Sequence, residues 1–195
     1  VVATVVQDGG EITVADSITG NVTQNDGKLT ALNAINGNVK QTKGEISTDK
    51  IDGALTQSAD GILTTKEVTG AATVEGMVNG DGGLTFGSTL DQAAGTIEAN
   101  GNLTVASTAN IAGTVTAADA EIGGKLTQTA GKLTATGNLT LKDGADVSGK
   151  VVANSVDATG KTVIANTGAD IVVVSEIKAG TLDVNDGKVD AATVV

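Results

Sequence analysis

Apolar and polar residues alternate along most of the chain in short runs. Val22 and Leu29, for example, are each followed by a threonine. Such alternation is the period of a β-strand, and Val, Ile and Thr favour its pleated surface. Glycine, asparagine and aspartate separate the runs, and these residues tolerate the backbone conformations of tight turns. The pattern therefore predicts short strands joined by corners.

The runs themselves recur with a period of about 17 residues, which marks a repeat architecture. Three sets of apolar positions keep this spacing in the first part of the chain. They are Ile18, Ile35, Ile51 and Val68; Val5, Val22, Val39 and Leu55; and Ile12, Leu29, Ile46 and Leu63. We expect each set to form one inward-facing stack.

A unit of this length is too short for a propeller blade and lacks the pattern of a helix-pair repeat. It has the size of one coil of a β-solenoid, in which each strand pairs with its equivalent in the next coil about 4.8 Å away. We predict an all-β, single-domain parallel β-solenoid (β-helix) over residues 1–195, with about 11 coils of roughly 17 residues.

The middle of the chain is less regular. Val68 begins a longer unit, in which Gly80–Gly82 is interpreted as an insertion before Leu84 and Thr85. Residues Ile111–Thr116 are interpreted as half a unit.

Glutamine recurs at one position of the repeat, at Gln7, Gln24, Gln41, Gln57 and Gln128. One interpretation is a polar stripe that binds sugar. The other is a structural ladder, in which each side-chain amide hydrogen-bonds the next, as in cross-β stacks. We favour the structural ladder because the position follows the repeat and not a local cluster.

A column of hydroxyl residues is also predicted. A regular array of hydroxyls could match a periodic surface such as ice or a crystalline polysaccharide, or it could be a solvated, strand-favouring face. We favour the solvated face. The column comprises Thr13, Thr30, Ser47, Thr64, Thr85, Thr104 and Thr134.

Composition argues against most chemistry. Without cysteine or histidine, the chain lacks thiol catalysis, common zinc ligands and serine–histidine triads. The absence of arginine, 1 % aromatic residues and a net charge of −11 argue against nucleic-acid binding. No apolar run is long enough to span a bilayer. We therefore predict that the chain is not an enzyme and has no catalytic residue, metal or cofactor. A glycan or calcium remains only as an alternative ligand. The segment that comes nearest to a calcium-binding loop is Asn79–Gly83.

The repeat runs to both ends of the sequence, and neither end contains a recognisable cap. A solenoid without caps exposes unpaired strand edges and an apolar cross-section. Stacking of such ends in one direction gives an open filament. We therefore predict a head-to-tail homopolymer whose interface contains Val1, Val2, Val5, Val6, Ala192, Thr193, Val194 and Val195.

The sequence starts with Val1 and not with methionine. We interpret this as a mature protein whose signal peptide has been removed. Together with the composition rich in Thr, Gly and Asn, it predicts an extracellular or cell-surface location.

The repeat residues resemble two groups of proteins. One is the secreted β-solenoids of bacterial adhesins and autotransporter passengers, and the other is the bactofilins, small β-helical proteins that polymerise end to end. The second resemblance implies polymerisation, in agreement with the exposed ends. We expect an extracellular fibre or coat protein; the alternative is an adhesin passenger or stalk that binds a glycan or host surface.

Overall fold

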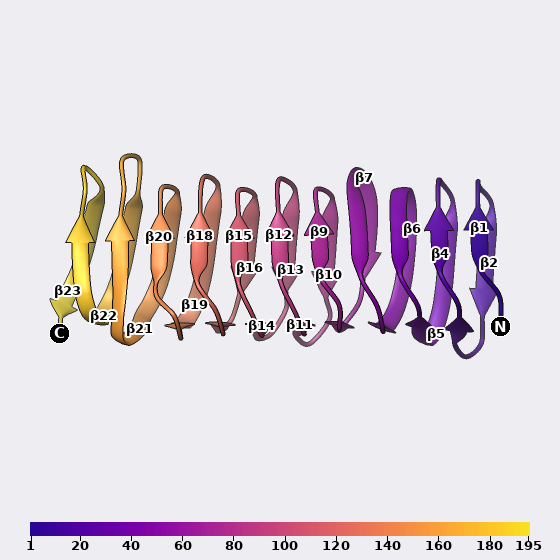
Figure 1. The fold of residues 1–195 in the computed structure, drawn as a ribbon, viewed down its shortest axis with the longest axis horizontal. Helices are drawn as coiled ribbons and strands as arrows, with labels where there is room; N and C mark the ends of the chain where they lie inside the picture. The colour runs from indigo at the N-terminus through magenta and orange to yellow at the C-terminus, as the bar shows by residue number, and fades with distance from the viewer.

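Every hydrogen-bonded strand pair in the structure is parallel, and each pair joins one coil of the chain to the next. The computed structural model describes all 195 residues as a rod of stacked coils (Figure 1). All 23 strands belong to one sheet, and the structure has no helix that could cross a membrane. The predicted fold class is confirmed: the chain is an all-β parallel solenoid of about 11 coils.

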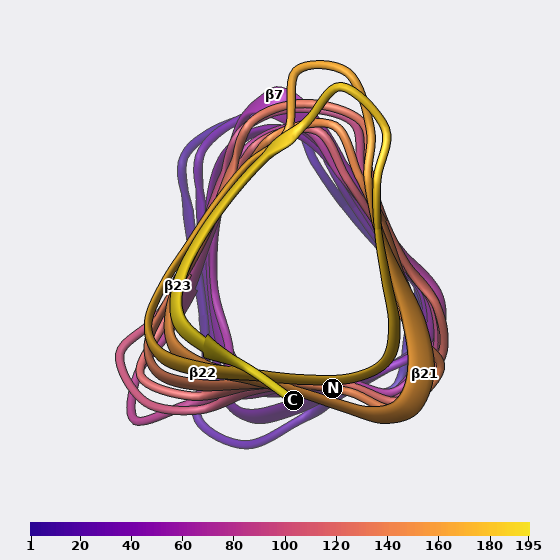
Figure 2. The ribbon, with the colours of Figure 1, turned by 90° about the vertical axis from the view of Figure 1, so that its left-hand side faces the viewer.

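Viewed along the rod, each coil is a triangle with three sides (Figure 2). Each side is a ladder of equivalent strand segments, one from each coil. Side 1 runs from Val5–Gln7 to Leu182–Val184, side 2 from Glu11–Val14 to Lys188–Ala191, and side 3 from Ile18–Thr19 to Thr193–Val194.

Most strands are short and occupy a single side. They are β1 (Val5–Gln7), β2 (Glu11–Val14), β3 (Ile18–Thr19), β4 (Val22–Gln24), β8 (Glu67–Val68), β9 (Ala72–Val74), β10 (Met77–Gly80), β11 (Leu84–Phe86), β12 (Leu90–Gln92), β13 (Thr96–Ala99), β14 (Leu103–Val105), β15 (Ala109–Ile111), β16 (Thr114–Ala117), β17 (Ala120–Ile122), β18 (Leu126–Gln128) and β20 (Ala145–Val147). Seven longer strands continue around a corner. They are β5 (Lys28–Asn36), β6 (Val39–Ile51), β7 (Leu55–Thr64), β19 (Lys132–Leu141), β21 (Lys150–Ala165), β22 (Asp170–Val184) and β23 (Lys188–Val194).

The core is a narrow column of side chains inside the triangle. The three predicted apolar stacks all exist, because their members are register partners in successive coils. Ile18, Ile35, Ile51 and Val68 are each 0 % exposed. One continuous cluster of 45 buried residues fills the rod. Since the three walls are close together, small and β-branched side chains fill the interior, and Phe86 is the only aromatic residue.

The predicted alignment of the middle coils is wrong. Met77–Gly80 is itself the side-2 strand, because Val78 pairs with Leu63. Leu84–Phe86 therefore belongs to side 3, where it pairs with Glu67–Val68. Of the residues interpreted as an insertion, Gly80 ends the side-2 strand, and Asp81 and Gly82 lie at the corner between these sides. Leu–Thr pairs occur on both sides 2 and 3, so their identity could not reveal the side.

The residues predicted to form half a unit, Ile111–Thr116, belong to a complete coil that runs from Ala109 to Ile122. Its three sides are β15, β16 and β17, each paired with strands before and after it. The corners of this coil contain fewer residues than those of the first coils. The unit is therefore shorter in the sequence, and for this reason its pattern suggested half a unit.

Glycines stack on one another at the corner between sides 1 and 2. Gly44 has φ +85, in the left-handed region where side chains are disfavoured. A Cβ there would also collide with the Gly27 carbonyl oxygen of the preceding coil. The corner column comprises Gly10, Gly27, Gly44, Gly61, Gly76, Gly95, Gly113, Gly131 and Gly149.

We predict that Gly44→Ala destabilises the fold by about 2 kcal/mol or more, because it adds backbone strain and a steric clash. The measurement is the midpoint of guanidinium denaturation followed by circular dichroism. Gly9→Ala is the matched control, because Gly9 lies at the same corner of the first coil with no atom within 4 Å of its added Cβ. Equal effects of the two substitutions would contradict this account of the corner.

Candidate assembly edges and the glutamine column

Four glutamines form a hydrogen-bonded ladder inside side 1. Gln7, Gln24, Gln41 and Gln57 are register partners in the first four coils. Each amide nitrogen donates to the amide oxygen of the preceding coil, at 3.2 Å for Gln24, 2.9 Å for Gln41 and 3.0 Å for Gln57. All four side chains are buried. The ladder therefore lies inside the rod, where it cannot act as a surface stripe for sugar.

The same glutamines also fasten the corner that follows them. The Gln41 amide nitrogen donates to the carbonyl oxygen of Gly44 at 2.9 Å and to that of Ile62 in the next coil at 2.9 Å. Gln7 and Gln24 make equivalent bonds. Because buried polar groups need partners, one side chain satisfies a turn carbonyl and a strand carbonyl together.

Sequence reasoning missed one member of this column. Gln92 is buried and donates to Gly95 and Thr114 oxygens at 3.2 and 3.1 Å. The signal that could have found it is a glutamine three residues before a corner glycine. This spacing also relates Gln128 to Gly131, whose carbonyl oxygen accepts at 3.5 Å.

The ladder does not extend to Gln128. Gln128 lies in the same column, but its register partners are Ile111 and Val147. Val74 likewise separates Gln57 from Gln92. The amide oxygens of Gln57, Gln92 and Gln128 consequently have no hydrogen-bond partner. Gln128 fastens its own corner without bonding another glutamine.

The predicted hydroxyl column is shorter than expected. On side 2, Thr13, Thr30, Ser47 and Thr64 are consecutive partners, and they are followed by Asn79 and Glu98 before threonine returns at Thr116 and Thr134. Including Thr85 and Thr104 in this column was wrong, because they lie on side 3 beside Glu67 and Glu121. A surface groove of about 280 Å³ follows three of the hydroxyl residues.

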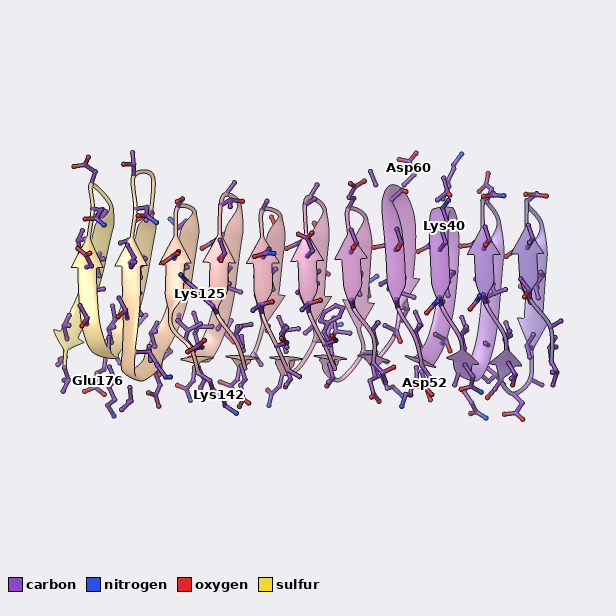
Figure 3. The ribbon with its side chains drawn as sticks, viewed as in Figure 1. Lys40, Asp52, Asp60, Lys125, Lys142 and Glu176 are labelled. Atoms are coloured by element: carbon purple, nitrogen blue, oxygen red, sulfur yellow. The ribbon has the colours of Figure 1, made fainter.

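Charged side chains are distributed over the outside of the rod. Lys40, Lys142 and Glu176 project outwards (Figure 3), and the structure contains no group of three carboxylates that could hold a metal ion. The ion pairs are all surface pairs, such as Lys66–Asp49 at 2.9 Å. Pairs of this kind contribute little to stability individually.

The two end coils leave the core incompletely covered. Strands β1 and β2 pair only with the second coil, and β23 pairs only with β22. Six apolar residues pack against the core without being fully buried: Val5 and Ile12 in the first coil, Ala179 in the coil before the last, and Leu182, Val189 and Ala191 in the last. Elsewhere another coil covers the equivalent positions. Each end of the described rod thus presents free backbone groups around an apolar centre.

The predicted interface residues all lie in these end coils, with different orientations. Val5 occupies an inward column with Val22, whereas Val6 pairs with the outward Thr23. Val2 also lies outward, opposite Thr19. Val194 pairs with the buried Ile177. The others are exposed: Val1, Ala192, Thr193 and Val195.

Opposite charges alternate at the C-terminal end of side 2. Lys150, Asp170 and Lys188 are successive partners in the outer column. The Asp170 carboxylate accepts a hydrogen bond from Lys150 at 2.9 Å, and its other oxygen lies 3.9 Å from the Lys188 ammonium. The bond from Lys150, assisted by both positive charges, lowers the pKa of Asp170 below its ordinary value of 3.8.

Comparisons with known proteins give one match. The family model described as "Bactofilin: Polymer-forming cytoskeletal" matches residues 68–167, just over half of the chain. No curated protein and no solved structure gives a significant match.

We predict that Gln41→Leu lowers the free energy of unfolding by about 2 to 4 kcal/mol, because it leaves buried groups above and below without partners. Gln128→Leu is the matched control and should cost less, since its column neighbours are apolar. The measurement is again guanidinium denaturation. A larger loss for Gln128→Leu would show that the ladder bonds are not the main contribution.

The lowered pKa of Asp170 predicts a pH dependence. A carboxyl with a depressed folded-state pKa stabilises the fold above its ordinary pKa, and this stabilisation is lost as the pH falls through the folded-state value. The stability difference between the unchanged protein and Asp170→Asn should therefore be constant near neutral pH and disappear in strong acid, once the carboxyl is protonated in the folded state. Thermal unfolding across this range is the measurement. A difference that persists at the acid end would contradict the assignment.

Proposed function

This chain belongs to the bactofilin family, and on that premise we propose that it is a structural protein whose copies join head to tail through the edges of the first and last coils. The family is one of polymer-forming cytoskeletal proteins, so assembly of the chain with itself follows from membership. The contribution of these particular edges is the part that we propose.

The observation that supports the edges is their incomplete core. Of the six apolar residues that pack against the core but stay partly exposed, five belong to the first and last coils, and the sixth, Ala179, lies in the coil before the last. A second copy would cover them with the same kind of side chain that covers their equivalents inside the rod. Burying apolar surface gains roughly 25 cal/mol per Å², and free strand edges pair readily with another chain. Both contributions favour stacking of one rod on another.

The assembly needs no catalytic step. A parallel ladder forms from backbone groups and apolar columns alone, which suits a structural protein and not an enzyme. The adhesin alternative has no support. The predicted extracellular location stays a prediction, and the proposal does not depend on it.

We predict that the purified chain forms unbranched filaments, visible by negative-stain electron microscopy, and that Val189→Lys prevents their growth. The substitution puts an ammonium group in the apolar cross-section of the last coil, where stacking would bury it unpaired at a cost of several kcal/mol. The critical concentration measured by sedimentation should rise roughly tenfold or more.

Thr116→Lys is the control, because Thr116 is exposed on side 2 in the middle of the rod. It should leave the critical concentration unchanged. Circular dichroism and the denaturation midpoint would show that both variants fold. Absence of filaments from the unchanged protein, or normal filaments from folded Val189→Lys, would refute the proposal.

A further inference from the structure

Side 2 has an outer column of residues, one from each coil, whose charges are confined to its two ends. Every member is a register partner of the next, so the column is unbroken. Uncharged residues occupy the middle coils. From the first coil to the last, the column reads Glu11, Lys28, Glu45, Ile62, Met77, Thr96, Thr114, Lys132, Lys150, Asp170 and Lys188.

The two charged ends of this column are complementary to each other. Counted inwards from the first coil, the signs are negative, positive and negative. Counted inwards from the last coil, they are positive, negative and positive. If two rods lie with side 2 of one against side 2 of the other, in opposite directions and with Thr96 opposite Thr96, opposite charges meet at both ends. The contacts at each end are Glu11 with Lys188, Lys28 with Asp170, and Glu45 with Lys150.

We propose that side 2 is an interaction surface for a second copy of this chain, and that two rods pair through it in opposite directions with Thr96 opposite Thr96. The pair has two-fold symmetry, so each outer column faces the same column of the other copy and every contact occurs twice. Pairing uses a face that joining at the ends leaves free. It therefore does not depend on how the end coils meet.

Each charged end would become a network and not a set of isolated ion pairs. Within one chain, Lys28 already lies 3.8 Å from Glu45, and Lys150 lies 2.9 Å from Asp170. Pairing sets these two ion pairs against each other, so each charge gains an opposite charge across the interface besides the one along the column. Exposed ion pairs contribute little individually, and networks contribute more.

The charges also select one register and one direction. Sliding the second copy by one coil puts Lys28 against another lysine, which is Lys150 or Lys188 according to the direction of the slide, and like charges repel. Rods paired in the same direction would instead set this column against the neighbouring outer column, which begins at Thr13. In that arrangement only Lys188 would meet an opposite charge, at Asp190.

Exposed apolar residues lie on the same face. Ile62 and Met77 are neighbours in the column and are 40 % and 37 % exposed. The half-buried Val152 and Val172 are neighbours in the other outer column. Pairing would set Ile62 against the aliphatic stem of Lys132, and the two valines against the surface groove of about 280 Å³. Removing these apolar groups from water favours association.

The face is large enough for a specific contact. At about 4.8 Å per coil and about 3.3 Å per residue along a strand, side 2 is about 50 Å long and about 13 Å wide. Pairing would cover about 650 Å² on each copy, near the roughly 800 Å² of a standard interface. The outlines of the coils largely overlap along the rod axis (Figure 2), so the face is continuous from end to end.

Glu98 is the one residue that would meet a like charge. It lies beside Thr96 in the other outer column and therefore faces Glu98 of the second copy. Glu98→Gln removes this repulsion and should lower the dissociation constant of the pair. An unchanged dissociation constant would contradict the proposed register.

The first test uses the absence of cysteine from the chain, because one introduced thiol then reports one position. A short bis-maleimide, in which each ring adds one thiol, should join Thr96→Cys to its own copy. Met77→Cys and Thr114→Cys should each link poorly alone and efficiently when mixed, because these positions face each other. Thr85→Cys, in the outer column of side 3, is the matched control and should stay unlinked on a denaturing gel.

The second test measures pairing by sedimentation velocity at low salt in the Val189→Lys chain, which is designed to prevent joining at the ends. Adding Glu45→Lys should raise the dissociation constant of the pair roughly tenfold, because a lysine then faces Lys150. Adding Lys150→Glu as well should recover most of this loss. Lys50→Glu is the matched control, because it breaks a surface ion pair on side 3 and should leave pairing unchanged.

Self-linking of Thr96→Cys, with recovery by the double charge reversal, supports the inference. Equal linking of Thr85→Cys and Thr96→Cys, or efficient self-linking of Met77→Cys, would overturn it. So would a chain that stays single at high concentration while circular dichroism shows it to be folded. The proposed function is tested separately by filament growth, so either proposal can fail without the other.

Discussion

Parallel backbone pairing between successive coils is the interaction on which the rest of the structure depends. It fixes the distance between coils and makes each residue the neighbour of its equivalents above and below. An apolar residue at one inward position therefore requires apolar residues at that position in the adjacent coils. The stack of Ile18, Ile35, Ile51 and Val68 is the direct result. Since a single coil has no core of its own, each coil is stable only against its neighbours.

The requirement for apolar residues at inward positions is weaker beside the corners, and polar side chains enter the core there. A glycine such as Gly44 lets two turns approach closely, and a glutamine such as Gln41 satisfies the carbonyl groups left by the turn. Where an apolar residue replaces the glutamine, as at Val74, the ladder ends and the Gln57 amide oxygen loses its partner. The column tolerates both residue types because each one fills the same narrow space beside the core.

The same pairing that builds the rod also explains why it would grow. An interior coil has both edges paired, whereas the first and last coils have one free edge each and an exposed apolar centre. Membership of a polymer-forming family agrees with this property of the fold. Charges on the outer columns contribute little to stability.

The sequence by itself determined the strand period, the repeat of about 17 residues, the parallel solenoid and the inward stacks of the first coils. These features follow from the alternation of apolar and polar residues and from the spacing of the repeat, which do not depend on the side that each residue occupies. The tertiary structure decided the alignment of the middle coils, the removal of Thr85 and Thr104 from the hydroxyl column, and the place of Gln92 in the glutamine column. The physical reason is that corners absorb a variable number of residues while the sides do not. Similar Leu–Thr pairs occur on all three sides, and only the hydrogen bonds between coils show which side each pair occupies.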